Sequence, residues 1–491
     1  MTPPARLCVT VTAATMAELR ERRDRVTGAD LVELRLDGVD RPDVAGALEG
    51  RRLPVIVTCR PTWEGGRYAG PEEARQALLA EALALGAEYV DVEWRAGFTD
   101  LVSAGGGRRI VLSMHDFTGV PDDLAAQVAA MSAVGAEVVK VAVMASRLDT
   151  VPALAALADR APRMALIAMG EAGLPSRLLA SRLGSCWTYA GDGAAPGQVP
   201  LERFRDEMGF ARIGPATALF GVVGRPVLHS RSPAMHNAAF RAAGVDAVHL
   251  PLAAADFDDF LAFADWAGLA GASVTAPFKI DALERADDCD AVSREVGAAN
   301  TLRRRGGRWE ARNTDVAGFL GPLQDAVPLR GARVTVLGAG GAARAVAVAL
   351  GSKGARVRVA ARRPGAAAAV AALAAGEAVP WPPPAGWDVI VNTTPVGTWP
   401  GVDETPLPGG PFSGGVAYDL VYAPPETRFL RDAAAAGLAT IGGLEMLVAQ
   451  AGEQFEWWTG QPAPARVMRD AAAASLARDA SRASGTSTET V

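Results

Sequence analysis

Patterns for metal binding and disulfide bonding are missing from this sequence of 491 residues, which has only four cysteines and four histidines. The cysteines lie far apart and match no disulfide or zinc spacing: Cys8, Cys59, Cys186 and Cys289. The histidines form no ligand cluster either: His115, His229, His236 and His249. We therefore expect no bound metal and a reducing, cytoplasmic setting.

Long apolar runs and an excess of basic charge are also absent. No segment approaches the roughly 18 uncharged apolar residues of a membrane span, and a strand pattern that begins at Leu7 leaves no room for a signal peptide. The net charge is −6 without a basic stripe, so we expect neither a membrane nor a nucleic acid as partner. Hydrophobic residues make up 49% and charged residues 21%, as in globular proteins, and the length predicts roughly two to four domains.

Eight short apolar segments, separated by helix-like stretches, occupy the first part of the chain. They cover residues 7–11, 31–36, 54–59, 89–94, 109–114, 138–143, 164–169 and 187–190. Eight strand–helix units in about 200 residues predict an α/β fold, namely a compact (β/α)8 TIM barrel. A doubly wound open sheet is the alternative, and periodicity alone does not exclude it.

Charged residues lie where the active site of such a barrel is expected. Glu33, Arg35 and Asp37 alternate along one strand and therefore share one face. His115 follows the fifth strand, and Lys140 lies inside the otherwise apolar sixth strand. Three more charges lie in strands or at their carboxyl ends: Arg60, Asp91 and Glu93.

Lys140 admits two interpretations. It forms a structural ion pair, for example with Glu33 or Glu93, or it acts as a Schiff-base nucleophile. Burial disfavours the charged form of an amine and frees the lone pair that a nucleophile needs. His115, on the neighbouring strand, would be a natural proton carrier for that nucleophile.

A second α/β region is predicted after residue 217. Apolar strands at 220–225, 248–252, 271–275 and 298–302 alternate with helices, one of them at 256–268. Its loops carry hydroxyl, amide and charged side chains in Ser230, Ser232, Thr275, Lys279, Asn300 and Asp315. Each is common in loops, and a solvated Lys279 is the simpler interpretation when it is taken alone.

A glycine-rich fingerprint follows the predicted strand 333–337. It opens a helix and leads to another strand at 356–360, which is the context of a dinucleotide-binding fold with backbone amides at the pyrophosphate. The residues concerned are Gly338, Gly340, Gly341, Ala342 and Arg344. Arg362 and Arg363 stand where an NAD site usually carries a carboxylate, so the sequence favours NADP. The alternative is a pair of surface arginines at a strand end.

The motifs of the first part together resemble type I 3-dehydroquinate dehydratase over roughly residues 5–208. They lie at 33–37, 60, 64–66, 113–117, 140–142, 176–178 and 195–198. The resemblance implies that Lys140 forms an imine with the substrate ketone and that His115 moves the proton and assists departure of water. It also implies substrate binding by Glu33, Arg35, Arg60, Gln198 and, as carboxylate clamp, Arg177. Ala194 replaces the usual serine, which should weaken binding modestly.

The second part resembles shikimate dehydrogenase over roughly residues 217–475. The motifs lie at 230–232, 274–279, 300–301, 313–315, 338–344, 392–394, 422 and 443–450. The resemblance implies Lys279 and Asp315 as the proton-transfer pair. It adds Tyr422 and Gln450 to the substrate site, with Ser230, Ser232, Thr275 and Asn300, and Asn392, Thr393 and Gly443 to the cofactor site. At four positions the sequence differs from the usual residues of that family, and we expect these differences to change cofactor affinity and selectivity: Ser273, Ala361, Pro395 and Thr398.

The expected layout is a dehydratase barrel at 1–212, a substrate-binding domain at 217–327, a Rossmann NADP-binding domain at 328–441, returning helices at 442–475 and a disordered tail at 476–491. This fusion resembles the bifunctional dehydratase–dehydrogenase of plants, with 3-dehydroquinate, 3-dehydroshikimate and shikimate as substrates and products. Two alternatives stay open. The second part could act on quinate or with NAD, or the chain could be a regulatory sensor that keeps both folds without catalysis.

Overall fold

The structure is a computed structural model that describes residues 4–191, 193 and 195–485. By its internal contacts the chain divides into two compact units, one built mainly from residues up to 217 and the other mainly from residues after 269. Ala194, which carries one of the expected departures, lies outside the described residues.

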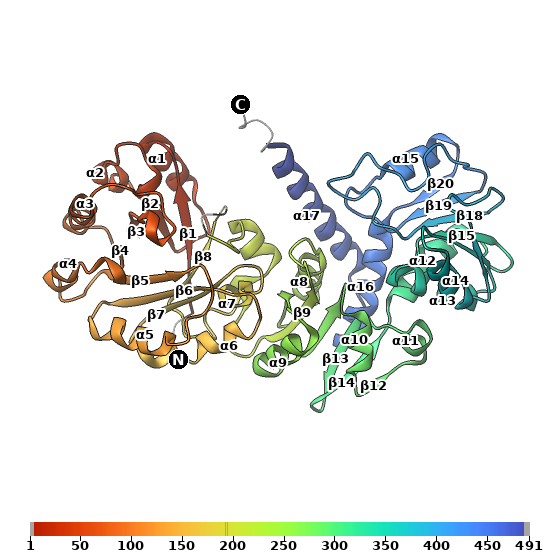
Figure 1. The fold of residues 1–491 in the computed structure, drawn as a ribbon, viewed down its shortest axis with the longest axis horizontal. Helices are drawn as coiled ribbons and strands as arrows, with labels where there is room; N and C mark the ends of the chain where they lie inside the picture. The colour runs from red at the N-terminus through yellow and green to blue at the C-terminus, as the bar shows by residue number, and fades with distance from the viewer. Residues whose placement is uncertain (1–3, 192, 194, 486–491) are drawn as a thin grey trace. The chain divides into compact units, whose positions relative to one another are not determined.

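The first unit contains eight parallel strands in the order β7-β6-β5-β4-β3-β2-β1-β8 (Figure 1). Between β7 and β8 the sheet narrows to a bridge between Met164 and Ser185, so the barrel is nearly closed. The predicted TIM barrel is confirmed and the open sheet is wrong. The strands are β1 (Arg6–Thr12), β2 (Leu31–Arg35), β3 (Val55–Thr58), β4 (Tyr89–Glu93), β5 (Ile110–Asp116), β6 (Val138–Met144), β7 (Met164–Met169) and β8 (Trp187–Ala190).

Helices follow the strands and bury apolar stripes against the barrel, as Leu79 and Ala82 of the third helix do at 0% exposure. Thr15 and Asp43 cap the first two, each accepting a hydrogen bond from a backbone N–H of the first turn. The helices are α1 (Met16–Arg25), α2 (Val44–Leu48), α3 (Glu72–Ala84), α4 (Thr99–Ala104), α5 (Leu124–Ala133), α6 (Thr150–Ala155) and α7 (Leu174–Leu178). A short 3-10 helix, η2 (Thr62–Glu64), follows β3 and places Glu64 at the carboxyl end of the barrel.

A six-stranded mixed sheet follows, in the order β10-β9-β11-β13-β14-β12. Its strands are β9 (Ala218–Gly224), β10 (Ala247–Ala253), β11 (Gly271–Val274), β12 (Asp288–Cys289), β13 (Thr301–Arg305) and β14 (Arg308–Arg312). The strand expected at 298–302 begins three residues later and forms an unexpected hairpin with β14. Gly306 and Gly307 have φ of 57° and 79°, which a two-residue hairpin turn requires.

Four helices accompany this sheet: α8 (Ser232–Ala242), α9 (Phe257–Ala267), α10 (Lys279–Glu284) and α11 (Ala291–Val296). The helix expected at 256–268 is confirmed as α9. Asp256 caps its start by accepting a hydrogen bond from the N–H of Asp259, and Gly268 ends it with φ of 66°.

The last sheet is parallel, in the order β17-β16-β15-β18-β19-β20, which is the 3-2-1-4-5-6 order of the Rossmann fold. The strands are β15 (Arg333–Leu337), β16 (Arg356–Ala360), β17 (Glu377–Val379), β18 (Val389–Asn392), β19 (Val416–Asp419) and β20 (Ala439–Ile441). The helices are α12 (Asp315–Ala326), α13 (Gly341–Ser352), α14 (Pro364–Ala372) and α15 (Arg428–Ala435). The sequence did not predict the two edge strands, β17 and β20, which have only three residues each.

Two long helices complete the chain, α16 (Gly443–Thr459) and α17 (Ala465–Gly485). The tail expected to be disordered from residue 476 is helical as far as Gly485, so that part of the prediction is wrong. Met468, Ala472 and Leu476 recur every four residues and are buried, which anchors one stripe of α17. Residues 486–491 lie outside the described residues.

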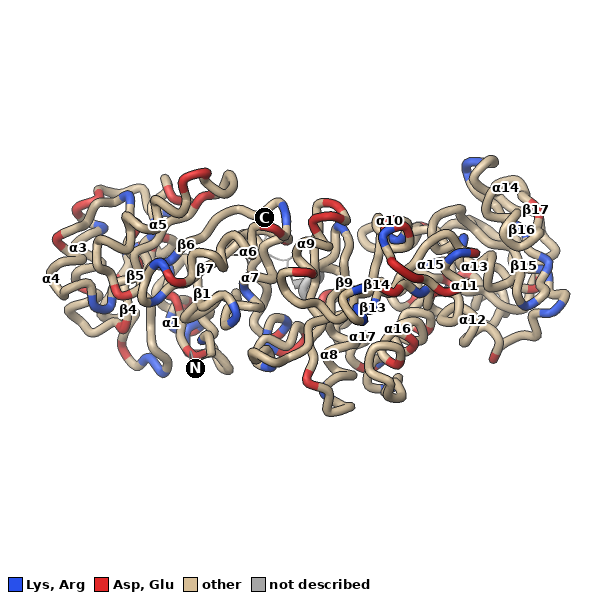
Figure 2. The backbone as a smooth tube through the Cα atoms, turned by 90° about the horizontal axis from the view of Figure 1, so that it is seen from below, with Lys and Arg blue, Asp and Glu red and all other residues tan. Residues whose placement is uncertain are grey.

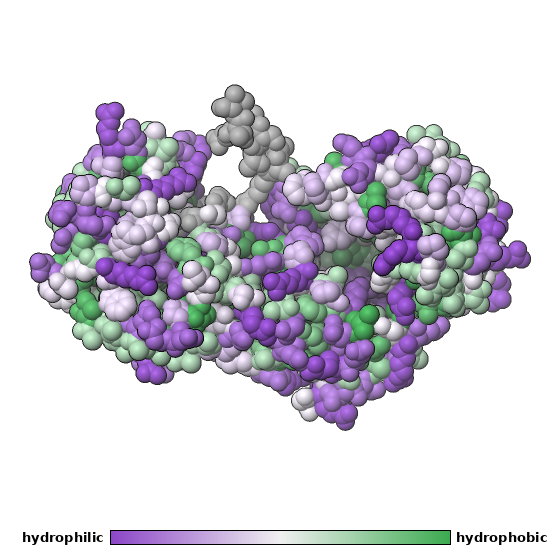
Figure 3. All heavy atoms as spheres, viewed as in Figure 1, coloured by the Kyte–Doolittle hydropathy of each residue, from purple (hydrophilic) through white to green (hydrophobic). Residues whose placement is uncertain are grey.

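Charged and apolar residues are mixed over the surface. Segments of Lys and Arg and segments of Asp and Glu are both spread along the backbone in Figure 2, and strongly hydrophobic residues lie scattered among polar ones on the face shown in Figure 3. No helix in the described part of the chain is long and apolar enough to cross a membrane.

Candidate active sites

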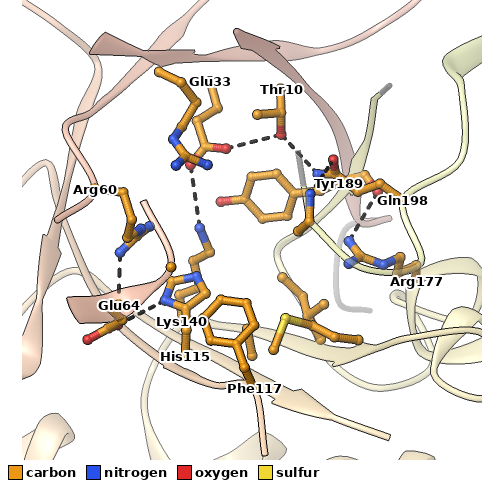
Figure 4. A pocket seen from close by; sticks show the side chains of 16 residues that line it. Thr10, Glu33, Arg60, Glu64, His115, Phe117, Lys140, Arg177, Tyr189 and Gln198 are labelled. Atoms are coloured by element: carbon orange, nitrogen blue, oxygen red, sulfur yellow. Dashed lines mark hydrogen bonds and ion pairs between the residues drawn. The ribbon is translucent and has the colours of Figure 1, made fainter. Parts of the chain in front are cut away.

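A pocket of about 490 Å³ opens at the carboxyl ends of the barrel strands (Figure 4), where TIM barrels place their active sites. The structure brings together all seven dehydratase residues that the sequence predicted: Glu33, Arg35, Arg60, His115, Lys140, Arg177 and Gln198. Thr10, Glu64, Phe117 and Tyr189 also line it.

Lys140 is 4% exposed and faces two carboxylates. Its Nζ lies 3.0 Å from Asp91 Oδ2 and 3.5 Å from Glu33 Oε1, and 4.5 Å from the centre of the Tyr189 ring. The possible pairing with Glu93 does not form. Glu93 instead pairs with Arg60 at 2.7 Å and with Arg75. The ion pair that the sequence allowed is therefore formed with Asp91 and Glu33.

The two carboxylates beside Lys140 are kept ionised. Burial by itself would raise their pKa values. The charges of Arg60 and Lys140 hold the pKa of Asp91 well below its usual range, and the charges of Lys140 and Arg35 lower the pKa of Glu33. Hydroxyl groups of Thr10 and Thr58 also donate to Glu33, at 3.0 and 2.9 Å.

Glu64 is a site residue to which the sequence reasoning gave no role. Its Oε1 lies 2.9 Å from His115 Nδ1, which leaves Nε2 as the nitrogen free of that bond. Burial raises the pKa of Glu64 to about 7. Burial, together with the charges of Arg60 and Lys140, lowers the pKa of His115 well below its usual value. Glu64 lies within a motif noted in the sequence, but only the fold brings it to a histidine 51 positions away.

Arg177 is 2% exposed and has no carboxylate within ion-pair distance among the described residues. It donates to two backbone carbonyls, those of Tyr189 at 3.4 Å and Pro196 at 3.3 Å, and its Nε has no hydrogen-bond partner there. Burial lowers the pKa of Arg177 to about 10. A buried cation in this state is a ready site for an anion.

The other predicted binding residues differ in how far they are engaged. Arg35 makes two hydrogen bonds of 2.8 Å with Asp37, so the protein itself already occupies part of its donor capacity. Gln198 donates to Thr10 Oγ1 at 3.1 Å and accepts from the N–H of Ala195. These bonds place its amide at the wall of the pocket.

Lys279 and Asp315 form the centre of a second site. Lys279 begins α10 and Asp315 begins α12, and their Nζ and Oδ2 atoms lie 2.6 Å apart. Asn300 donates to the other oxygen of Asp315 at 2.8 Å and to Gln450 Oε1 at 3.3 Å. The fold therefore brings together four of the predicted residues from four separate segments.

The predicted hydroxyl residues lie in loops at one sheet edge. Strands β9 and β11 are parallel neighbours. Ser230 in the loop after β9, Ser232 at the start of α8 and Thr275 after β11 therefore all follow the same edge. The N–H of Ser232 donates to Ser230 Oγ at 3.2 Å. Tyr422 follows β19, and burial raises the pKa of its phenol.

Ser273, one of the departures, is buried and donates to Gln454 Oε1 at 2.8 Å. Gln454 also donates to Thr301 Oγ1 at 3.0 Å. The serine therefore supports the strand next to the site.

A groove with an empty volume of about 1210 Å³ runs along the carboxyl edge of the last sheet, which is where dinucleotides bind in this fold. It is lined by five of the predicted cofactor residues: Gly338, Gly340, Arg362, Arg363 and Thr393. Gly338 has φ of 111° and a Cβ there would lie 2.6 Å from Thr393 Oγ1, so only glycine fits. Both arginines are exposed.

The other predicted cofactor residues are not among those that line this groove. Asn392 accepts hydrogen bonds from the N–H and hydroxyl of Thr394, and Arg344 donates to the carbonyl of Val296 at 3.0 Å. A Cβ on Gly443 would lie 2.4 Å from the carbonyl oxygen of Leu420. Gly341 and Ala342 form the first turn of α13. Of the departures, Ala361 and Pro395 line the groove, and Thr398 donates to a backbone carbonyl.

Family models match both halves of the chain, and one relative matches most of its length. The model of type I 3-dehydroquinase matches residues 7–213, and models of the shikimate dehydrogenase substrate-binding and C-terminal domains match residues 222–302 and 443–473. The chloroplastic bifunctional 3-dehydroquinate dehydratase/shikimate dehydrogenase of Arabidopsis thaliana is 35% identical over 94% of this chain and 83% of its own length. The chain belongs to this bifunctional family.

The dehydrogenase half has further relatives. The shikimate dehydrogenase (NADP(+)) of Symbiobacterium thermophilum is 41% identical over 54% of this chain and 96% of its own length. A crystal structure of shikimate dehydrogenase in complex with NADP+ has 31% identity and a TM-score of 0.51, and covers 54% of this chain and 97% of its own. The Thermus thermophilus enzyme in complex with NADP(H) and shikimate has 37% identity and a TM-score of 0.50, and covers 52% and 99%.

Proposed function

We propose that this chain catalyses two consecutive reactions, the dehydration of 3-dehydroquinate to 3-dehydroshikimate and the NADPH-dependent reduction of that product to shikimate. The observation that carries the proposal is that one chain contains two sites with different sets of reactive residues. A buried lysine lies among carboxylates and near a histidine in the barrel. A lysine–aspartate pair lies in a fold that also carries a dinucleotide groove.

In the barrel, the amine of Lys140 attacks the substrate ketone, and the carbonyl oxygen leaves as water to give an imine. The protonated imine draws electrons from the adjacent carbon, so a proton on that carbon becomes easier to remove. Nε2 of His115 takes this proton while Glu64 holds Nδ1. The departing hydroxyl receives a proton from the histidine and leaves as water, and hydrolysis of the imine then restores Lys140.

The substrate carboxylate binds in the barrel to a charged group that has no oppositely charged partner among the described residues. Arg177 supplies two directed N–H groups to the substrate carboxylate, because no carboxylate of the described chain occupies them. Glu33, Arg60 and Gln198 line the same pocket and bind the hydroxyl groups. Arg35, at the end of β2, is already bonded to Asp37 and keeps only part of its donor capacity for the substrate.

In the second site, bound NADPH supplies the two electrons and one hydrogen that reduce the ketone. Lys279 donates the proton that the carbonyl oxygen needs as negative charge develops there. Asp315 holds the ammonium at 2.6 Å, and Asn300 fixes the other oxygen of that carboxylate. Ser230, Ser232 and Thr275 bind the substrate carboxylate and hydroxyls, and Gln450 and Tyr422 complete the site.

The arginines at the end of β16 select NADPH. Arg362 and Arg363 line the groove, and no carboxylate is among the described residues that line it with them. Two guanidinium groups favour a 2′-phosphate, which an acidic residue at this place would repel.

Borohydride tests the covalent step of the proposal. Added during turnover with 3-dehydroquinate, it should reduce the imine, inactivate dehydration and add one ligand mass to a peptide that contains Lys140. After the excess borohydride is removed, the protein should still reduce fresh 3-dehydroshikimate with NADPH, since that site lies elsewhere in the chain. Full inactivation with an unmodified Lys140 would contradict the mechanism.

A further inference from the structure

The C-terminal helix reaches the loop that carries the two substrate-binding serines. Arg231, which stands between Ser230 and Ser232, is 5% exposed. Its Nη2 lies 2.6 Å from Asp479 Oδ2, and its Nη1 donates to Ser475 Oγ at 3.0 Å. The contact therefore joins the serine loop to a helix about 245 positions further along the chain.

The two partners of Arg231 lie on the same face of helix α17. Ser475 and Asp479 are four residues apart, so they share one face of α17. Helices α17 and α8 lie side by side in Figures 1 and 2, and Arg231 immediately precedes α8. A charged pair and a hydroxyl thus fix the guanidinium where the loop enters the helix.

We propose that Asp479 and Ser475 are positioning residues for the dehydrogenase reaction: through Arg231, helix α17 holds Ser230 and Ser232 in the geometry that binds the substrate carboxylate. The inference rests on the proposed function of the serine loop. A loop that is ordered before the substrate arrives does not lose its conformational freedom on binding, so affinity rises. The anchor should therefore affect substrate affinity more than the proton-transfer step at Lys279.

Asp479→Asn keeps the size of the side chain and removes the ionic half of the anchor. The KM for shikimate should rise about threefold to tenfold, since a partly exposed ion pair has a modest free energy. The kcat for shikimate oxidation should stay within about twofold, and the KM for NADP+ and the dehydratase activity should not change. Asp479→Glu, which retains the carboxylate, should recover most of the lost affinity.

Two control variants distinguish positioning of the serine loop from a general stabilisation of the fold by helix α17. Asp470→Asn is the same substitution on α17, in an exposed pair with Arg466, and should leave KM for shikimate unchanged. Arg469→Gln removes the pair that joins α17 to Glu445 of α16 without touching the serine loop. If Arg469→Gln raises KM for shikimate as much as Asp479→Asn does, α17 merely supports the fold and the proposal is wrong.

A double-mutant cycle completes the test. In a Ser232→Ala background the effect of Asp479→Asn should shrink, because both changes act through the same loop. If the effects of the two substitutions on KM for shikimate are fully additive, the proposal that Asp479 acts through the serine loop is wrong. Failure of the proposed function would look different: the wild-type protein would not oxidise shikimate with NADP+ at all, which would overturn both ideas. An active wild type with an unchanged KM in Asp479→Asn would overturn the anchor alone.

Discussion

The two proposed catalytic lysines lie in opposite surroundings. Lys140 is buried in the middle of a strand, between Asp91 and Glu33. Lys279 begins a short helix, keeps a quarter of its side chain exposed and has Asp315 as its charged partner. A lysine that forms an imine must react as the neutral amine, and burial disfavours the charged form of an amine. A lysine that donates a proton must recover one in every cycle, and contact with solvent provides it.

The same contrast extends to how the two sites meet anionic ligands. In the barrel, the buried Arg177 is committed to no carboxylate among the described residues. In the cofactor groove, Arg362 and Arg363 are exposed. A buried arginine interacts strongly with an anion, and leaving it without one costs free energy. Exposed arginines interact more weakly because solvent screens their charges, so two of them act together.

The largest effect should come from Lys279. Lys279→Met removes the proposed proton donor and keeps much of the side-chain volume. The kcat for reduction of 3-dehydroshikimate should fall about 10²–10⁴-fold, while KM changes little and dehydratase activity, the control for folding, is retained. A variant with kcat within a few-fold of wild type and a raised KM would mean that Lys279 only binds substrate. Tyr422 would then be the first alternative donor to test.

Arg177→Met should separate function from stability in the barrel. Each charged hydrogen bond to the substrate carboxylate is worth about 1.5–3 kcal/mol, so KM for 3-dehydroquinate should rise roughly tenfold or more. The thermal midpoint of the protein should not fall, because the change removes a buried charge that has no carboxylate partner in the described chain. A marked loss of stability with an unchanged KM would assign Arg177 to the fold instead.

Replacing Arg362 and Arg363 with alanine tests the exposed pair. The KM for NADPH should rise about tenfold, since charged contacts to a phosphate are lost, and the KM for NADH should change little. Steady-state reduction of 3-dehydroshikimate with each cofactor gives both values. An equal effect on the two cofactors would show that these arginines do not recognise the 2′-phosphate.

The smallest effect should be a change in the pH profile of dehydration. With Glu64 ionised, its oxygen accepts the Nδ1–H of His115, and Nε2 is free to take a proton. Since the pKa of Glu64 is about 7, kcat for dehydration should rise as the pH passes through about 7. Glu64→Gln should lower kcat and lose this inflection, whereas the profile of the dehydrogenase reaction should be the same in both proteins.

The same carboxyl should also affect stability, with the sign set by its raised pKa. The folded barrel binds the Glu64 proton more tightly than the unfolded chain does, so this contribution is complete below pH 4.5 and is lost as the pH rises through about 7. Between these values the thermal midpoint of the wild-type barrel should fall relative to that of Glu64→Gln. A constant difference across this range would contradict the raised pKa.

The sequence by itself indicated the fold class, the eight barrel strands and the residues that we propose to bear the chemistry. Apolar segments of the right length and spacing indicated the eight barrel strands, and the glycines of 338–341 indicated the Rossmann turn, because these signals are local. Lys140 stood out as the one charge in an apolar strand, and Lys279 through its motif. These predictions needed only neighbours along the chain.

Only the tertiary structure decided which partner each charge meets. In the structure Lys140 pairs with Asp91 and not with Glu93, and His115 is hydrogen-bonded to Glu64. Arg177 has no carboxylate partner among the described residues. The structure also extends α17 through the segment expected to be disordered, where Asp479 meets Arg231. The physical reason is that periodicity reports the face on which a side chain lies, whereas an ion pair depends on which distant segments the fold brings within about 4 Å.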